Sequence, residues 1–182
     1  PVGRRVAVLG CGNIAIDAVT QALRLGAEKA TVIYRRSAAD MSAYSFEYEL
    51  AKADGAGFVF HAVPVEVLGE HGHVTGLRLA RTEVCDGRLV VLPNSEWTEP
   101  YDMVLSAVGQ EKQTPLLSEV FPGLTLDRRG RVLHDPATMQ TSLPNVFAGG
   151  DCVSGGREVV NAVAEGKKAA RGIHRHLAAA TV

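Results

Sequence analysis

The chain has 182 residues, 46% of them hydrophobic, and a formal net charge of −1 at pH 7. This length allows one or two small domains with a real core. The near-neutral charge offers no footprint for a nucleic acid or an anionic membrane surface, and no apolar run approaches the roughly eighteen residues of a membrane span. The composition therefore predicts no nucleic-acid partner and no membrane segment.

The cysteines and histidines are too scattered for a metal or redox centre. Cys11, Cys85 and Cys152 are far apart and form no CxxC, which argues against a disulfide scaffold, a redox dithiol or an iron–sulfur cluster. The six histidines are scattered, and no Cys or carboxylate joins the pair His71 and His73 or the pair His174 and His176 at ligand spacing, so we expect no metal site. Reduced cysteines suit a cytoplasmic protein. The start at Pro1, without an initiator Met, is interpreted as a piece of something longer.

The N-terminal elements follow the order strand, glycine turn, helix, strand. Residues 4–9 and 30–34 are short apolar runs that predict strands, and residues 15–25 predict a helix. Gly10 allows a sharp turn after the first strand, and Gly12 allows backbone N–H groups to approach a pyrophosphate at the helix N-terminus. This is the opening of a dinucleotide-binding βαβ unit.

The end of the second strand selects the cofactor. A carboxylate there would accept the ribose 2′-OH of NAD, whereas an arginine suits the 2′-phosphate of NADP. The sequence places Arg35 and Arg36 there and no acid, which favours NADP over NAD. The alternative is that the arginine pair is a solvated strand end.

The middle of the chain predicts a helix, a third parallel strand, and then a change of pattern. The helix is expected over residues 44–52 and the strand over 58–61. Runs separated by glycine turns then predict a three-stranded antiparallel meander inserted into the parallel sheet. The meander strands are expected at 63–68, 74–84 and 88–92, and a buried strand at 102–107 that rejoins the main sheet.

Beyond Gln110 the chain changes role. The polar residues 111–115 mark the domain boundary, which gives domains 1–111 and 112–182. We then expect a small hairpin over 124–133, a strand over 143–148, and a helix ending near residue 178.

The turn Gly149-Gly150-Asp151 precedes that last helix and predicts a second nucleotide contact. The Asp151 carboxylate can accept a sugar or ribityl hydroxyl. The N–H groups of Glu158, Val159 and Val160 at the helix start suit an anionic or electron-rich group. An ordinary tight turn is the alternative.

Four motifs occur in a familiar order: GCGNIAID at 10–17, YRRS at 34–37, AVGQ at 107–110 and TSLPNVFAGGD at 141–151. So arranged, they resemble the NADPH-dependent FAD oxidoreductases of the glutamate synthase small-subunit type, within the two-dinucleotide-binding flavoprotein superfamily. That group includes the FAD/NADPH part of dihydropyrimidine dehydrogenase and related ferredoxin-linked reductases. The resemblance implies an α/β fold: a Rossmann-like NAD(P)-binding domain, plus the C-terminal portion of an FAD-binding domain.

The resemblance also assigns site residues. Gly10, Gly12, Asn13 and Ile14 would hold the NADPH pyrophosphate, and Arg35 and Arg36 its 2′-phosphate. Ala107, Gly109 and Gln110 would lie near the nicotinamide half. Gly150 and Asp151 would contact FAD at the ribityl and pyrophosphate, with Val159 and Val160 near the isoalloxazine edge. Hydride would pass from NADPH to FAD and on to an acceptor, so no residue is assigned as catalytic.

The chain also departs from that family. It has one glycine fingerprint where the family has two, and it lacks the family's iron–sulfur cysteines. It therefore looks like a C-terminal half that binds NADP(H), does not retain FAD and does not turn over alone. Its partners would be the missing N-terminal FAD-binding half and an iron–sulfur protein. An exposed apolar patch on Val146, Phe147 and the last helix would favour a homodimer.

Two other functions are considered. A non-catalytic NADP-binding sensor or partner-docking module would have no use for the second nucleotide contact. A disulfide reductase of the thioredoxin reductase type would need a CxxC, which this chain lacks.

Overall fold

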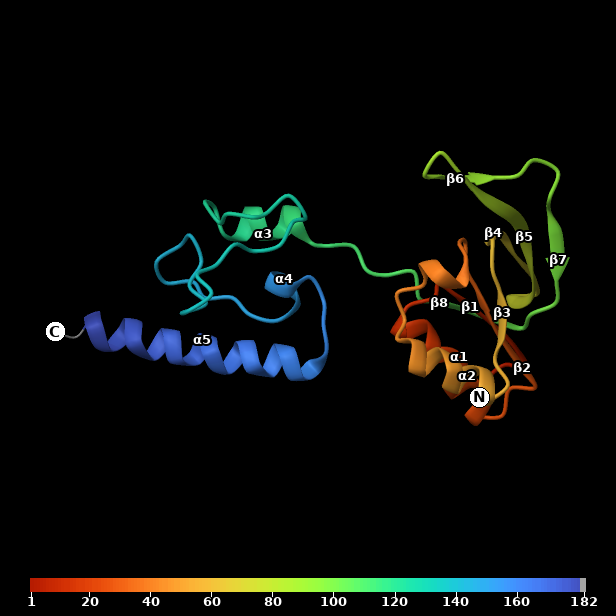
Figure 1. Ribbon diagram of the computed structural model, residues 1–182, viewed down its shortest axis with the longest axis horizontal. Helices are drawn as coiled ribbons and strands as arrows, with labels where there is room; N and C mark the ends of the chain where they lie inside the picture. Colours follow the sequence, from red (N-terminus) through yellow and green to blue (C-terminus); the bar gives the residue numbers. More distant parts are fainter. Residues whose placement is uncertain (181–182) are drawn as a thin grey trace. The chain divides into compact units, whose positions relative to one another are not determined.

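The computed structural model describes residues 1–180, and the side chains of residues 1–179. The chain divides into two compact units, Pro1–Gln110 and Glu111–Val182 (Figure 1).

The first unit is built on a parallel sheet of four strands in the order β3-β2-β1-β8. These strands are β1 (Arg5–Leu9), β2 (Lys29–Ile33), β3 (Gly57–Val59) and β8 (Met103–Ser106). The strands predicted near each of these positions are confirmed, and β8 rejoins the main sheet as predicted, where it pairs in parallel with β1. His61, expected in the third strand, lies beyond its end in a left-handed conformation.

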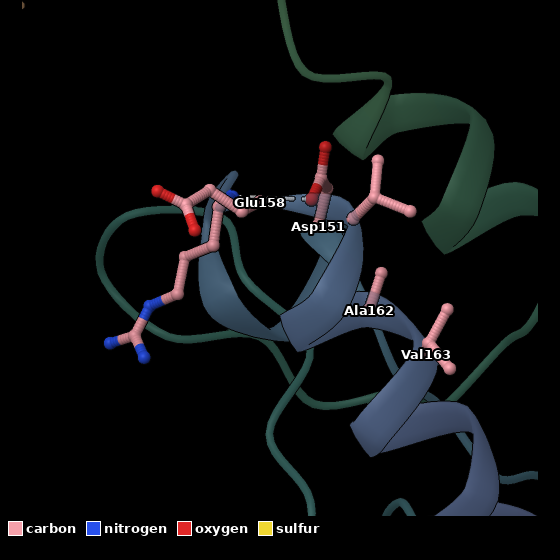
Figure 2. A pocket seen from close by; sticks show the side chains of 6 residues that line it. Asp151, Glu158, Ala162 and Val163 are labelled. Atoms are coloured by element: carbon pink, nitrogen blue, oxygen red, sulfur yellow. Dashed lines mark hydrogen bonds between the residues drawn. The ribbon is translucent and has the colours of Figure 1, made fainter.

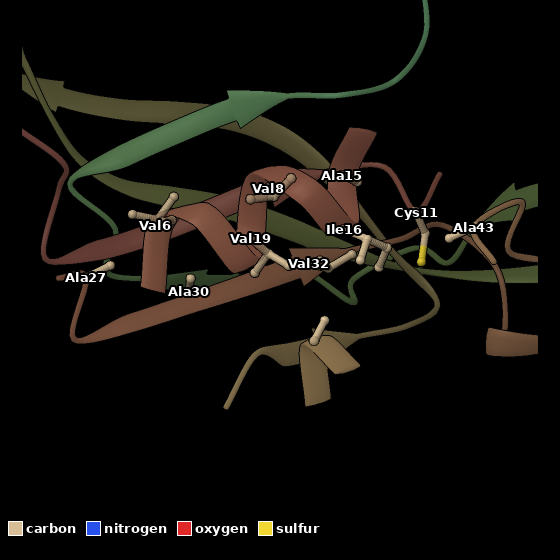
Figure 3. Close-up of a cluster of buried hydrophobic side chains, with 12 residues drawn as sticks. Val6, Val8, Cys11, Ala15, Ile16, Val19, Ala27, Ala30, Val32 and Ala43 are labelled. Carbon is tan, nitrogen blue, oxygen red and sulfur yellow. The ribbon is translucent and has the colours of Figure 1, made fainter. Parts of the chain in front are cut away.

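Two helices cover one face of this sheet: α1 (Asn13–Arg24) and α2 (Ser45–Ala53), with a short 3₁₀ turn at Ala38–Asp40 before α2. Alternate strand residues point to opposite faces, so Val6 and Val8 of β1 face the helices and pack against Ile16 and Val19 of α1 in one buried cluster (Figure 3). Both predicted helices are confirmed, and their packing fixes the glycine turn that joins β1 to α1.

The opposite face of the parallel sheet meets a second, antiparallel sheet. Its strands are β4 (Ala62–Glu70), β5 (His73–Cys85), β6 (Arg88–Val91) and β7 (Trp97–Glu99). The meander is confirmed as antiparallel. It is not a continuation of the parallel sheet, however, and the sequence reading missed β7, which pairs with β5.

The physical reason for two separate sheets lies in the core. Leu77 and Leu79 of β5 are fully buried against Ala7 and Ile33, which are the residues of β1 and β2 that point away from the helices. The antiparallel strands therefore pack face to face on the parallel sheet instead of extending its edge.

The second unit contains three helices and little sheet. The helices are α3 (Thr114–Val120), α4 (Asp151–Ser154) and α5 (Val159–Ala180). The last helix was predicted, whereas α3 and α4 were missed. The expected strand over 143–148 is wrong: this segment makes only isolated bridges such as Gln140 with Phe147, because no neighbouring strand takes up its backbone groups. The expected hairpin over 124–133 likewise reduces to one bridge, Leu126 with Val132.

The core of the second unit is small. Its buried apolar residues are Val132, Met139 and Val153, and Ala169 of α5 packs against them. Across the described residues, no helix is both long and apolar enough to pass through a membrane.

Candidate functional site

The four parallel strands all end at one edge of the sheet, and the sequence-predicted residues of the first unit follow those ends. Gly10 and Gly12 follow β1, the Arg35–Arg36 pair follows β2, and Ala107 to Gln110 follow β8. Ligands of open α/β sheets bind at the carboxyl ends of the strands. The fold therefore brings these residues to one place, with the arginines on the β2 side and residues 107–110 on the β8 side.

Gly10 sits at the tightest point of this edge. Its φ is +112°, and a Cβ there would stand 2.3 Å from the carbonyl oxygen of Ala107. Its N–H donates to the Ile33 carbonyl at 3.0 Å, while the Ala107 N–H donates to the Leu9 carbonyl at 2.8 Å. The turn after β1 is thus fastened to the ends of both neighbouring strands, and only glycine fits.

The beginning of α1 is open to a ligand. Gly12 is the N-cap residue, and no side chain caps the helix. Unpaired N–H groups in a first helical turn favour an anionic group. Ile14 projects from this turn with 68% of its surface exposed. The side chain of Asn13 has a different task, because its Oδ1 accepts the N–H of Tyr44 at 3.0 Å and so holds the chain that leads into α2.

The arginine pair is exposed and anchored through its backbone. The Thr82 hydroxyl donates to the Arg35 carbonyl at 2.8 Å, and the His61 N–H donates to the Arg36 carbonyl at 3.2 Å. Among the residues that the structure describes, neither guanidinium has a carboxylate within 4.0 Å. Both cationic groups are therefore available to an anion.

An acid that the sequence reading overlooked lies close by. The Asp40 carboxylate accepts the Ser37 hydroxyl at 2.6 Å and the Ser37 N–H at 3.2 Å. These bonds lower the pKa of Asp40, and the charges of Arg36 and His61 lower it further. Because the Asp40 carboxylate already accepts both bonds from Ser37, this carboxylate is poorly placed to bind a ribose hydroxyl.

His61 is a second residue that sequence reasoning missed. It is exposed, has a φ of +54°, and follows the end of β3 next to Arg36. The signal was present in the sequence, because a residue after the third parallel strand must reach the same edge as those after the first two.

At the β8 side of the edge, the three predicted residues differ in their surroundings. Ala107 is half-buried under the glycine turn, whereas Gly109 and Gln110 are exposed. Gly109 has a φ of +102° with open space where a Cβ would point.

The second predicted site lies in the second unit, between α4 and the beginning of α5. A pocket of about 440 Å³ there is lined by Asp151, Val159 and four neighbours (Figure 2). Val160 is exposed and does not line it. The Asp151 carboxylate accepts the N–H of Arg157 at 3.4 Å, which orders the turn that leads into α5.

Gly150 is held from within the chain. Its φ is +80°, and its N–H donates to Oε2 of Glu165 at 2.6 Å. Gly150 directly precedes Asp151 in the chain, but its N–H is already hydrogen-bonded to Glu165.

The three cysteines do not pair as a dithiol. Cys11 is buried and Cys152 exposed, and all three cysteines are free. Burial raises the pKa of both of these thiols, which favours the unreactive protonated form. Within the described residues, no three His, Cys, Asp or Glu side chains gather as a metal site.

Comparison with known proteins shows the family. Residues 1–166 match the family model described as "Pyridine nucleotide-disulphide oxidoreductase". The chain is 39% identical over 181 residues to the NADP(+)-dependent formate dehydrogenase subunit beta of Moorella thermoacetica, covering 96% of this chain and 25% of that protein. It is 37% identical over 183 residues to the glutamate synthase [NADPH] small chain of Escherichia coli, covering 94% of this chain and 38% of that protein.

Among solved structures, the fold matches thioredoxin reductase from T. acidophilum with a TM-score of 0.77 and 26% sequence identity. That match covers 94% of this chain and 52% of the reductase. The chain thus spans well under two thirds of the proteins that it resembles.

Proposed function

The chain belongs to the pyridine nucleotide-disulphide oxidoreductase family, and on that premise we propose that it is the NADPH-binding part of a flavoprotein oxidoreductase. In the complete protein, hydride would pass from NADPH to FAD and then to an acceptor. The two cofactors supply that redox chemistry, and the residues of this chain bind and orient them.

One observation carries the proposal: an uncapped helix start and two uncommitted arginines lie at the same sheet edge. The α1 N-terminus suits a pyrophosphate, and the guanidinium groups of Arg35 and Arg36 suit a 2′-phosphate. Similarity to NADPH-named relatives supports the same cofactor. Asn13 would act by shaping the turn, Ile14 by apolar contact, and Ala107, Gly109 and Gln110 at the nicotinamide half.

The second unit would belong to the FAD-binding domain. Asp151, Gly150, Val159 and Val160 would face the flavin, with residues 1–111 and 112–182 as the two domains. The pocket between α4 and α5 is compatible with such a contact. It is open and has one carboxylate already engaged, so we expect this chain alone to lose FAD and to be inactive. A purified chain that absorbs as a flavoprotein would contradict this.

Calorimetric titration with NADP⁺ and NAD⁺ tests the cofactor. We expect NADP⁺ to bind, and the Arg35→Ala/Arg36→Ala double variant to bind it about 100-fold more weakly, because two charge-assisted contacts are lost. NAD⁺ binding should change about twofold or less. The matched control is Arg128→Ala/Arg129→Ala, which removes another exposed arginine pair from the second unit. Equal affinity of the unmodified chain for NADP⁺ and NAD⁺ would refute the 2′-phosphate assignment.

A non-catalytic NADP-binding sensor or docking module is the second candidate. Helix α5 carries an exposed apolar stripe made of Val159, Val163, Ile173 and Leu177. This stripe favours the second candidate, since a docking protein needs an exposed apolar surface. The longer native protein separates the two. A flavin-containing protein that reduces ferricyanide with NADPH supports the oxidoreductase, whereas a flavin-free protein that binds NADP(H) supports the sensor.

The remaining partners follow from the same proposal. They are the N-terminal FAD-binding half, an iron–sulfur protein as electron partner, and a second copy in a homodimer through the α5 stripe. Three free cysteines fit a cytoplasmic location.

A further inference from the structure

We propose that the hydroxyl of Ser42 donates a hydrogen bond to the cofactor pyrophosphate, so that residues 41–44 form a second wall of the site opposite the glycine turn. This inference rests on the proposed dinucleotide function. It adds a binding residue that lies about thirty positions from the glycine motif and belongs to none of the four motifs.

The wall is fastened to the glycine turn at two points. The Ala43 N–H donates to the Cys11 carbonyl at 3.3 Å, and the Tyr44 N–H donates to Oδ1 of Asn13 at 3.0 Å. Ala43 is buried, and Figure 3 shows it beside Cys11. Ala43 and Tyr44 directly follow Ser42, and because both are hydrogen-bonded to the glycine turn, they restrain the position of Ser42.

Ser42 faces the glycine that the site depends on. Its Oγ lies 3.2 Å from the point where a Cβ on Gly12 would stand. The side chain is exposed, and within the described part of the chain its hydroxyl makes no hydrogen bond. A free O–H donor is therefore held against the open N-terminus of α1.

The local charge suits an anion at this position. A hydroxyl can rotate to donate to a phosphate oxygen, and a bond to a charged acceptor is stronger than a neutral one. Residues 41–44 contain no carboxylate, and the preceding acid, Asp40, is engaged by Ser37. The wall therefore adds a donor without adding a repulsive charge.

Ser42→Ala and Ser42→Asp, titrated with both NADP⁺ and NAD⁺, test the inference. We expect Ser42→Ala to weaken both by about tenfold, the effect of one hydrogen bond to a charged group. Ser42→Asp should weaken both by about 100-fold, because it places a carboxylate against the pyrophosphate. The NADP⁺/NAD⁺ ratio should stay constant, since both cofactors share the pyrophosphate.

Ser118→Ala and Ser118→Asp, at an exposed serine of α3, are the matched controls and should bind like the unmodified chain. Circular dichroism of each variant checks that it is folded. Wild-type affinity in both Ser42 variants, with the arginine variants still losing NADP⁺, would overturn the Ser42 assignment and leave the proposed function standing. An unmodified chain that binds neither cofactor would overturn both.

Discussion

The two units of the chain differ in how completely they bury their apolar side chains. In the first unit, Val6, Val8 and Val19 are fully buried between sheet and helices, and Leu77 and Leu79 are fully buried between the two sheets. Among the described residues of the second unit, three apolar side chains are buried, and the longest helix keeps much of its apolar surface in solvent. The first unit buries a large apolar core within itself, whereas the second unit leaves much of the apolar surface of α5 exposed.

The difference is clearest along α5. The apolar face of this helix is exposed, as the sequence predicted, with Val159 at 79% and Leu177 at 59%. The helix instead packs through Ala169 and through Gly172, where a Cβ would stand 2.0 Å from the Thr138 carbonyl oxygen. Around the helix axis, Ala169 lies about 80° and Gly172 about 140° from the line through Val159 and Leu177. The helix thus presents two faces, and this unit covers one of them.

Gly10→Ala should produce the largest loss of stability. The new Cβ would overlap the Ala107 carbonyl and the backbone would keep a positive φ, so we expect about 4 kcal/mol of destabilisation. Urea unfolding followed by fluorescence measures it in the first unit alone, because Trp97 of β7 is the only tryptophan.

Gly26→Ala is the matched control for this variant. Gly26 also has a positive φ, +103°, but nothing stands within 4 Å of its Cβ position. It should cost about 1 kcal/mol, the strain without the overlap. Equal effects of the two substitutions would mean that the contact with Ala107 does not constrain the turn.

Gly172→Ala should give the next largest effect, and only in the second unit. Overlap with Thr138 and crowding of the Phe147 ring outweigh the better helix propensity of alanine, for a net loss of about 2 kcal/mol. Far-ultraviolet circular dichroism follows α5 directly, while Trp97 fluorescence should show no change in the first unit.

Gly166→Ala, on the exposed face of the same helix, should have the opposite sign. Nothing stands within 4 Å of its Cβ position, so the helix gains about 1 kcal/mol from propensity alone. If Gly166→Ala destabilised the unit as much as Gly172→Ala, the assignment of covered and uncovered faces would be wrong.

The difference between the two units also explains which parts of the fold could be predicted from the sequence. The βαβ opening was predictable because Gly10, Gly12 and the strand residues obey strong local rules, and β8 because it is a short buried run. The failures have a different cause. Residues 143–148 have the composition of a strand, but pairing requires a neighbour that no local pattern contains. The contact that α5 makes within its own unit was not predicted, because it is formed at small residues such as Gly172 and not at hydrophobic ones.

The candidate site, like the fold, could be predicted only in part. Arg35 was placed at the sheet edge from its position after the second predicted strand, whereas Gly109 was assigned through the family resemblance; both follow parallel strands. Ser42 was not predicted, because its proximity to the glycine turn depends on a hydrogen bond between distant segments, from the Ala43 N–H to the Cys11 carbonyl. Asp40 was overlooked although its bonds to Ser37, three residues before it, are local. Val146 and Phe147, expected on the surface, are half-buried, since the Phe147 ring packs against His176 at 5.8 Å between centroids.

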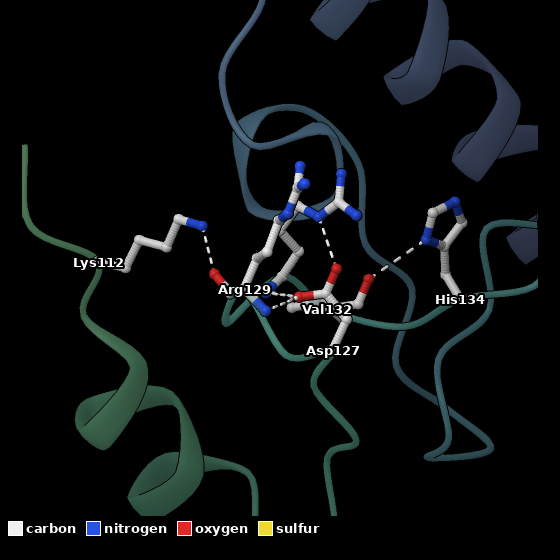
Figure 4. Close-up of polar contacts among 6 residues, drawn as sticks. Lys112, Asp127, Arg129, Val132 and His134 are labelled. Atoms are coloured by element: carbon white, nitrogen blue, oxygen red, sulfur yellow. Dashed lines mark hydrogen bonds and ion pairs between the residues drawn. The ribbon is translucent and has the colours of Figure 1, made fainter. Parts of the chain in front are cut away.

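The smallest expected effect concerns the polar turn at residues 127–131 of the second unit, which is stabilised by the Asp127 carboxylate. Oδ1 of Asp127 accepts the N–H groups of Arg129 and Arg131 at 2.8 and 2.9 Å, and Oδ2 accepts Nε of Arg131 at 2.7 Å (Figure 4). Asp127→Asn should lower the urea midpoint of this unit modestly. Glu119→Gln, an exposed carboxylate on α3, is the control and should leave it unchanged.

The pH dependence of that difference tests the cause. Bonds from the Arg131 N–H, the Arg131 side chain and the Arg129 N–H lower the pKa of Asp127 from 3.8 to about 2. A carboxylate with a depressed folded-state pKa stabilises fully above its unfolded pKa and loses that contribution as pH falls toward the folded value. The gap between wild-type and Asp127→Asn midpoints should therefore stay constant down to about pH 4 and narrow below it. A gap independent of pH throughout this range would mean that the charge of Asp127 does not stabilise the turn.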